Sequence, residues 1–156
     1  MTDRASGGGV VDESNEASLF RGLNLVVMPV WLAMIVAPRS SLTARIVRWS
    51  DGLLAGLAAA YAVQLGLSVA TSDARPDFGD VSVLRSTLAT PGGFLTGWTH
   101  FLAFDLFVGR WIWRTSLDEG RGARLALFLT LMAGPAGLGV FGLQRRSLSP
   151  APRPAR

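Results

Sequence analysis

Three ionisable side chains lie within one aromatic and apolar stretch of the sequence, GWTHFLAFDLFVGRWIW, which runs from Gly97 to Trp113. They are His100, which is the only histidine of the chain, Asp105 and Arg110. An imidazole and a carboxyl group can exchange protons with a substrate, and a guanidinium can stabilise developing negative charge. The stretch therefore carries the groups needed for acid–base chemistry in apolar surroundings.

Four long apolar segments must position these groups, and they are typical of a membrane protein. Hydrophobic residues make up 49% of the 156 residues and charged residues 17%, against about 25% charge in soluble domains. The segments cover residues 19–37, 53–71, 93–113 and 123–143. Each is close to the ~20 residues that cross a hydrocarbon core as a helix. The sequence therefore predicts an all-α fold, a four-helix transmembrane bundle over residues 19–146.

Tails and a long loop flank these segments. Residues 1–18 are rich in glycine and acidic residues and lack the basic start of a secretory signal, so we expect a disordered tail. Residues 147–156 are rich in arginine and proline and are also expected to be unstructured. In the loop at 72–92, apolar residues recur at helical spacing behind Asp80, which suits an N-cap. This pattern predicts a short helix at the membrane interface.

The flanking arginines bear on the orientation of such a bundle. The polar stretches at 40–52 and 114–122 are interpreted as loops. With four crossings both termini lie on one side, and the arginines then number seven on that side and six on the other. The Arg145–Arg146 pair directly after the last segment favours a cytoplasmic location for both termini, because arginine accumulates on the cytoplasmic side.

The ionisable groups of the third segment need polar partners on other helices. His100 and Asp105 lie about 140° apart around a regular helix, and so do Asp105 and Arg110. A lone charge at the bilayer centre costs about 2.5–3.5 kcal/mol on insertion scales. The strong polar candidates on the first two segments are Arg21, Asn24 and Gln64. We expect Asp105 to form an ion pair with Arg21 or Arg110.

Two interpretations of this polar cluster remain open. The charges could only lock the helices together, or His100, Asp105 and Arg110 could handle a proton or a substrate, since intramembrane ionisable groups are functional candidates by default. Arg110 could also extend to the interface, about one turn from Arg114. One histidine and no cysteine make a poor ligand set, so no metal is expected. The residues that could contact a long apolar ligand are Trp98, Phe101, Asn24, Gln64 and Trp31.

The same stretch carries a family resemblance. WTHFLAFDLFVGR, from Trp98 to Arg110, resembles the W-x-H-x-L-x-x-D-L-F-x-x-R motif of the abscisic-acid-deficiency-four-like family. PVWLAMIVAP, from Pro29 to Pro38, is similar to that family's P-x-W/Y-x-x-M-x-x-x-P signature, and GPAG at 134–137 is similar to its G/C-P-x-G element. In order and spacing, the resemblance covers roughly residues 19–146.

The resemblance implies a fold and a chemistry. Plant members of this family are four-span plastid membrane proteins needed to form neoxanthin from violaxanthin, an isomerisation in which an epoxide opens and a neighbouring proton leaves to give an allene. Residues 1–18 are too short and too acidic for a plastid transit peptide. The chain therefore looks like a bacterial-type member, located in the inner membrane.

Three functions follow as hypotheses. The first is a carotenoid or xanthophyll isomerase that uses intramembrane acid–base chemistry and no cofactor. The second is a non-catalytic membrane protein that binds pigment or scaffolds a pathway enzyme, and the third is a small proton-coupled carrier. The expected partners are the lipid bilayer and a carotenoid or another long isoprenoid. The formal net charge of +4 comes without a basic helix face, so no nucleic-acid partner is expected. The Gly52-xxx-Gly56 and Gly93-xxx-Gly97 spacings would permit a homo-oligomer.

Overall fold

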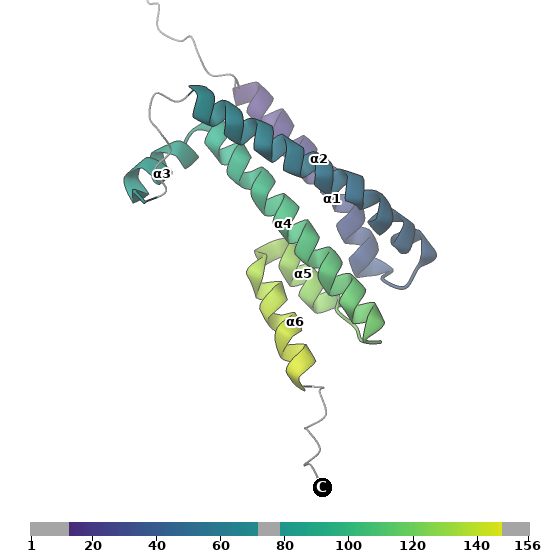
Figure 1. Cartoon of the computed structure of the whole chain (residues 1–156). Coiled ribbons are helices and arrows are strands. Elements are labelled where there is room, and N and C mark those ends of the chain that lie inside the picture. Colours follow the sequence, from purple (N-terminus) through teal and green to yellow (C-terminus); the bar gives the residue numbers. More distant parts are fainter. Residues whose placement is uncertain (1–12, 72–78, 148–156) are drawn as a thin grey trace, which may run out of the picture.

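The computed structural model describes residues 13–71 and 79–147, and within them all regular structure is helical (Figure 1). The predicted all-α fold is therefore confirmed. Most of the tails predicted to be disordered at 1–18 and unstructured at 147–156, and residues 72–78 of the predicted loop, lie outside the described residues. The described residues form the helices α1 (Glu13–Val36), α2 (Ser41–Thr71), α3 (Val81–Leu88), α4 (Pro91–Asp118), α5 (Arg124–Ala133) and α6 (Pro135–Ser147).

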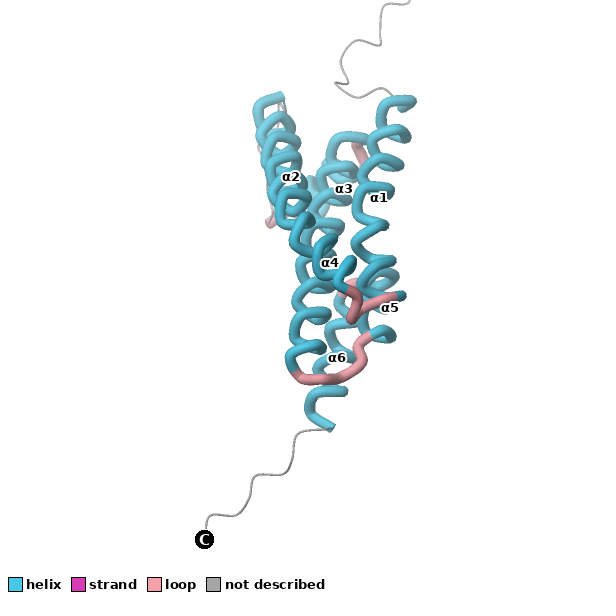
Figure 2. The backbone as a smooth tube through the Cα atoms, turned by 90° about the vertical axis from the view of Figure 1, so that its right-hand side faces the viewer, coloured by secondary structure: helices cyan, strands magenta, loops and turns pink. Residues whose placement is uncertain are grey.

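Three long helices, α1, α2 and α4, form the main body, and α4 packs against both of the others. α1 and α4 run in the same direction and α2 runs the opposite way (Figures 1 and 2). The turn between α1 and α2 is closed by Thr43, whose Oγ1 donates hydrogen bonds to the carbonyl oxygens of Ala33 and Ala37. α1 and α4 approach closely at Gly109, where an added Cβ would lie 2.4 Å from Cη2 of Trp31.

α2 begins twelve residues earlier than the segment predicted at 53–71, so the loop predicted at 40–52 was wrong. The side chains of Thr43, Val47 and Ser50 are buried, at a spacing of three to four residues that is typical of one helix face. Arg45 and Arg48 lie on the exposed face of the same turns. Because these arginines interrupt the apolar residues, a search for long apolar segments does not detect this amphipathic pattern.

The fourth apolar segment, predicted as one crossing at 123–143, forms two short antiparallel helices instead. The chain reverses at Gly134, whose φ of +44° favours glycine, and Pro135 then opens α6. An added Cβ on Gly137 would lie 2.3 Å from the backbone nitrogen of Thr130, so α6 returns directly along α5. We call this pair the α5–α6 hairpin.

The far end of the hairpin confirms the reversal. Nη1 of Arg121, which precedes α5, donates to the carbonyl oxygen of Gln144 near the end of α6 at 3.1 Å. Glu119 accepts from Arg145 at 2.7 Å. The described ends of the chain therefore lie at opposite ends of the molecule (Figure 1), and the prediction that both termini lie on one side is not supported by this fold.

The short helix predicted in the long loop is confirmed as α3. Asp80 is its N-cap and accepts hydrogen bonds from the hydroxyl and the backbone N–H of Ser82, both at 2.7 Å. These bonds stabilise the carboxylate and hold the pKa of Asp80 below its usual range. α3 packs against α4 close to the start of that helix.

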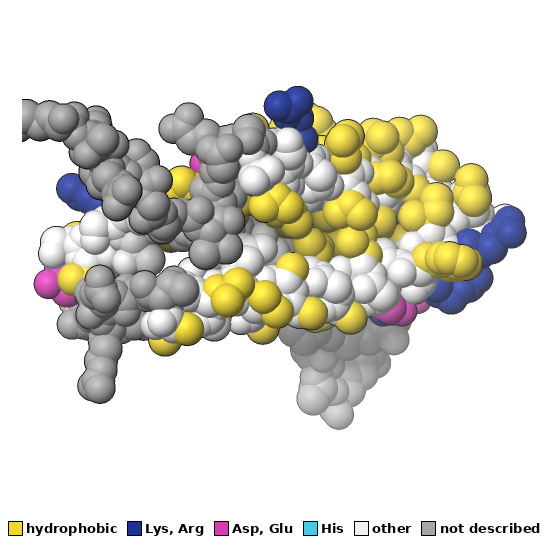
Figure 3. Space-filling view, turned by 90° about the horizontal axis from the view of Figure 1, so that it is seen from above, with side chains coloured by type: hydrophobic (Ala, Val, Ile, Leu, Met, Phe, Trp, Pro, Cys, Tyr) yellow, Lys and Arg dark blue, Asp and Glu magenta, His cyan; other side chains and the backbone are white. Residues whose placement is uncertain are grey.

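The surface of the molecule is rich in apolar side chains. In the part of the chain that the structure describes, two helices are long and apolar enough to cross a membrane, namely Asn15–Val36 in α1 and Ser41–Ala70 in α2. α4 has the length, but it carries His100, Asp105 and Arg110 within its apolar stretch. Figure 3 shows hydrophobic side chains spread along one face, and a group of arginine side chains at one end with further arginines elsewhere. This exposed apolar surface indicates contact with a membrane.

Candidate functional site

His100 lies on the side of α4 that faces α2. Its ring stacks on Phe104 at a centroid distance of 4.5 Å, and Tyr61 of α2 lies 5.4 Å away. The preceding residue, Thr99, is fully buried, and its Oγ1 lies 3.4 Å from Nε2 of Gln64. The imidazole is therefore held by aromatic rings beside a polar contact between α2 and α4.

Asp105 faces a different neighbour, the tip of the α5–α6 hairpin. Its carboxyl group is half-buried, and an added Cβ on Gly134 would lie 2.8 Å from its Oδ1. Within the described ranges, no arginine forms an ion pair with it. The C-terminus of α5 and the N-terminus of α6 meet at this tip, so the opposite partial charges of the two helix dipoles lie beside the carboxyl group.

Arg110 forms an ion pair with Asp51, a residue of α2 that the sequence reasoning assigned to a loop and so missed as a partner. Nη2 of Arg110 donates to Oδ1 of Asp51, and the guanidinium is buried, with 5% of its side chain exposed. Nε and Nη1 of Arg110 are buried and have no hydrogen-bond partner in the described part of the chain. The pair connects α2 to α4, and this role matches the structural interpretation for Arg110.

The predicted partners on α1 do not reach Asp105. Arg21 is exposed and its Nε donates to the carbonyl oxygen of Ala17, while Asn24 donates to that of Phe20 at 2.7 Å. The reason is that Arg21 and Asn24 lie at a different height along the bundle axis from Asp105. Phe20 lies 5.1 Å from Trp98, which is seven residues before Asp105, or about 10 Å along the axis of α4. The structure therefore does not form the ion pair between Arg21 and Asp105 that the sequence predicted.

The aromatic residues predicted to bind a ligand have different environments. Trp98 packs against Phe20 and Phe94, and its Nε1 is buried without a hydrogen-bond partner among the described residues. Phe101 is 61% exposed. Trp31 is fully buried against Gly109 and fills the contact between α1 and α4, so it lies in the core rather than on an accessible surface.

Taken together, α4 presents an imidazole toward α2 and a carboxyl group toward the hairpin, about 7.5 Å apart along the helix axis. Exposed phenylalanines, Phe101 and Phe104, accompany them. The two proton-exchanging groups therefore face different neighbours of the same helix. In residues 13–71 and 79–147, no group of three or more His, Cys, Asp or Glu side chains is placed to hold a metal ion.

Comparison with known proteins adds one finding. The model of the family described as ABA DEFICIENT 4-like matches residues 18–141. This range includes all of α2 to α5, most of α1 and half of α6. No curated protein and no solved structure matches the chain.

Proposed function

Because the chain belongs to the ABA DEFICIENT 4-like family, which is associated with carotenoid (neoxanthin) biosynthesis, we propose that it is a multi-pass membrane protein of a bacterial inner membrane that acts on a carotenoid or another long isoprenoid. The two apolar helices α1 and α2 support the membrane location. Membership of this family supports a carotenoid or a related isoprenoid as the substrate.

The proposed membrane arrangement has three crossings, α1, α2 and α4, and replaces the four continuous spans expected from the sequence. The 28 residues of α4 extend about 42 Å, which is enough to cross the bilayer. The 10 residues of α5 extend only about 15 Å, half of the ~30 Å hydrocarbon core. The α5–α6 hairpin thus enters and leaves at the same side, and its reversed backbone is shielded by α4, as such structure in a membrane requires.

We also propose an orientation of these three helices in the membrane. Eight arginines of the described residues lie at the end with the α1–α2 turn: Arg39, Arg45, Arg48, Arg114, Arg121, Arg124, Arg145 and Arg146. Only Arg21 and Arg85 lie toward the other end. Arginine accumulates on the cytoplasmic side. The end of α6 is therefore cytoplasmic in our proposal and the start of α1 is on the opposite side.

Single cysteines will test this orientation, because the native chain has none. We expect a membrane-impermeant thiol reagent to label Asn15→Cys, but not Ser147→Cys, in intact cells whose outer membrane has been permeabilised. Both cysteines should react after the inner membrane is opened. Labelling of both or of neither in intact cells would contradict three crossings, and labelling of Ser147→Cys alone would reverse the orientation.

The proposed reaction is an isomerisation of an epoxide-bearing carotenoid by acid–base chemistry. An acid donates a proton to the epoxide oxygen as the C–O bond breaks, and a base takes a proton from the neighbouring carbon chain, so that a hydroxyl and an allene form without change of composition. His100 and Asp105 are the residues proposed for these two proton transfers, within a site where water is scarce and charges act strongly. The observation that carries the proposal is the Asp105 carboxyl group, which lies at the hairpin tip without an ion-pair partner in the described chain.

Incubation of the purified protein with violaxanthin, followed by chromatography of the pigments, tests this function. We expect time-dependent formation of an allenic isomer of unchanged mass, and we expect His100→Ala to slow it at least about 100-fold. Phe107→Ala, which changes another exposed ring of α4, is the matched control and should keep its activity. If the pigment stays bound but chemically unchanged, the isomerase proposal fails.

A non-catalytic pigment-binding or scaffolding protein is the second candidate. The observation that favours it is the pair of Arg110 with Asp51, since one of the three ionisable groups of α4 is already explained by helix packing. Gly52 and Gly56 have no neighbours within 4 Å of an added Cβ, so this face of α2 is open to a second helix. A homo-oligomer stays a prediction.

A further inference from the structure

We propose that the groove between α1 and α2 near their connecting turn binds an anionic phospholipid from the cytoplasmic leaflet. We call it the α1–α2 groove. It has a volume of about 460 Å³ and is lined by Val30 on α1 and by Leu42, Arg45, Ile46, Trp49, Ser50 and Leu53 on α2. The proposal rests on the membrane location given above, but not on any reaction with a carotenoid.

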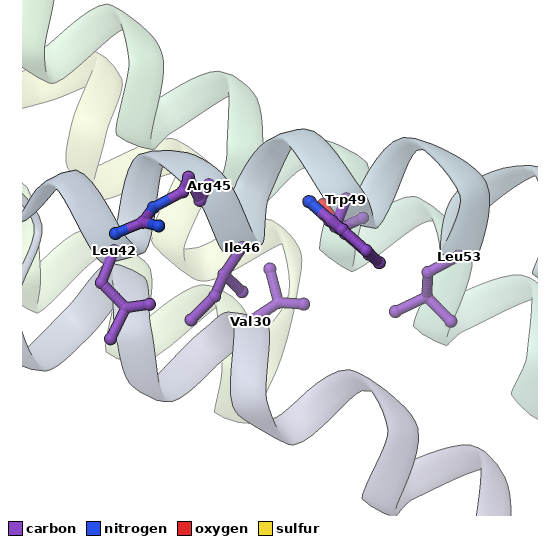
Figure 4. A pocket seen from close by; sticks show the side chains of 7 residues that line it. Val30, Leu42, Arg45, Ile46, Trp49 and Leu53 are labelled. Atoms are coloured by element: carbon purple, nitrogen blue, oxygen red, sulfur yellow. The ribbon is translucent and has the colours of Figure 1, made fainter.

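The walls of the groove suit an acyl chain. Figure 4 shows the side chains of Leu42, Ile46 and Leu53 directed from α2 toward α1, where Val30 faces them. These side chains form a continuous apolar strip over about three turns of α2, roughly 16 Å by the rise of a helix. A lipid tail lying along this strip would bury apolar surface that is otherwise open.

One positive charge borders this apolar strip. Arg45 lines the groove one turn after the start of α2. The ion pairs in the described parts of the chain connect Asp51 with Arg110, and Glu119 with Arg121 and Arg145. Arg45 is in none of them, and neither are its neighbours at this end, Arg39, Arg48 and Arg114. The guanidinium of Arg45 is therefore available to bind a phosphate.

The position of these groups matches that of a lipid headgroup. Trp49 is 84% exposed and lies one turn deeper than Arg45, in the order expected for a tryptophan at a membrane interface. Basic pockets between helices on the cytoplasmic side are typical sites for anionic headgroups. A neutral lipid would fill the apolar strip equally well but would leave Arg45 without an anion, and for this reason the anionic lipid is favoured.

Native mass spectrometry of the detergent-purified protein, titrated with phosphatidylglycerol or phosphatidylcholine, tests the proposal. We expect tighter binding of phosphatidylglycerol, and we expect Arg45→Gln to weaken it about fivefold, the effect of one basic residue at a membrane surface. Trp49→Ala should weaken the binding of both lipids. Arg85→Gln, which removes an exposed arginine of α3, is the matched control and should bind as the native chain does.

Three further results separate the alternatives. Soluble glycerol phosphate should not compete, since competition would mean that the site binds phosphate rather than a lipid. Equal binding of the two lipids, or equal affinities of Arg45→Gln and Arg85→Gln, would overturn the proposal. Flotation of the native chain with phosphatidylcholine vesicles, measured first, reports the membrane location on its own. Flotation without preference for phosphatidylglycerol therefore rejects only the lipid site.

Discussion

Replacing Asp105 by Asn should reduce the formation of an allenic isomer from violaxanthin by about 100-fold or more, because an amide cannot exchange the proton that the reaction requires. The side chain keeps its shape, and no ion pair of the described residues is lost with it. The contact with Gly134 is therefore expected to persist, and the fold with it. Initial rates of pigment conversion with equal amounts of folded protein provide the measurement.

Asp118→Asn is the matched control for this change. It removes an exposed carboxyl group from the last turn of the same helix, far from the hairpin tip, and should leave the rate unchanged. A second measurement, retention of pigment by each variant, separates binding from chemistry, because Asp105→Asn should still retain the pigment. Equal rates for Asp105→Asn and the native chain would reject Asp105 as a proton-exchanging group.

Replacing Asp51 by Asn should give the largest loss of thermal stability among single charge changes on α2 and α4. The guanidinium of Arg110 would keep its buried position but lose the one anionic partner it has among the described residues, and a buried charge without a partner is strongly destabilising. We expect the Tm of the detergent-solubilised protein to fall by about 5 °C or more. Thermal unfolding followed by circular dichroism checks this result.

The double variant Asp51→Leu with Arg110→Met distinguishes a lost charge pair from lost packing. The double variant leaves no buried charge without a partner, so it should recover most of the Tm lost by Asp51→Asn. Asp118→Asn should unfold at the same temperature as the native chain. A Tm for Asp51→Asn that matches this control would show that the pair does not hold α2 against α4.

Much of this architecture could be predicted from the sequence. Apolar length alone placed three helices, and the helical spacing behind Asp80 placed the N-terminus of α3. The geometry of a regular helix indicated that His100, Asp105 and Arg110 do not share one face of α4 and so need partners on other helices. In the structure, Arg110 pairs with Asp51 of α2. These features depend on local periodicity, which a single sequence records.

Two features could not be predicted because they depend on contacts between segments. Asp51 was missed as a partner of Arg110 because the arginines near it make the sequence of the first three turns of α2 resemble that of a polar loop. The reversal at Gly134 was missed because an apolar run of the right length with an internal glycine–proline pair is also typical of a kinked crossing. A hairpin forms here rather than a kinked crossing because Gly137 has no side chain, which allows α6 to lie directly on Thr130 and Ala126.

In the proposed membrane arrangement, the short α5–α6 hairpin would make the two leaflets unequal for this protein. At the end with the α1–α2 turn the hairpin covers α4, and Phe141 of α6 packs against Trp111 at a centroid distance of 5.5 Å. On the other side Phe101 and Phe104 are 61% and 59% exposed. In that arrangement, an apolar molecule dissolved in the leaflet opposite the hairpin would reach Asp105 by two-dimensional diffusion and stop against the hairpin tip, without leaving the bilayer for water.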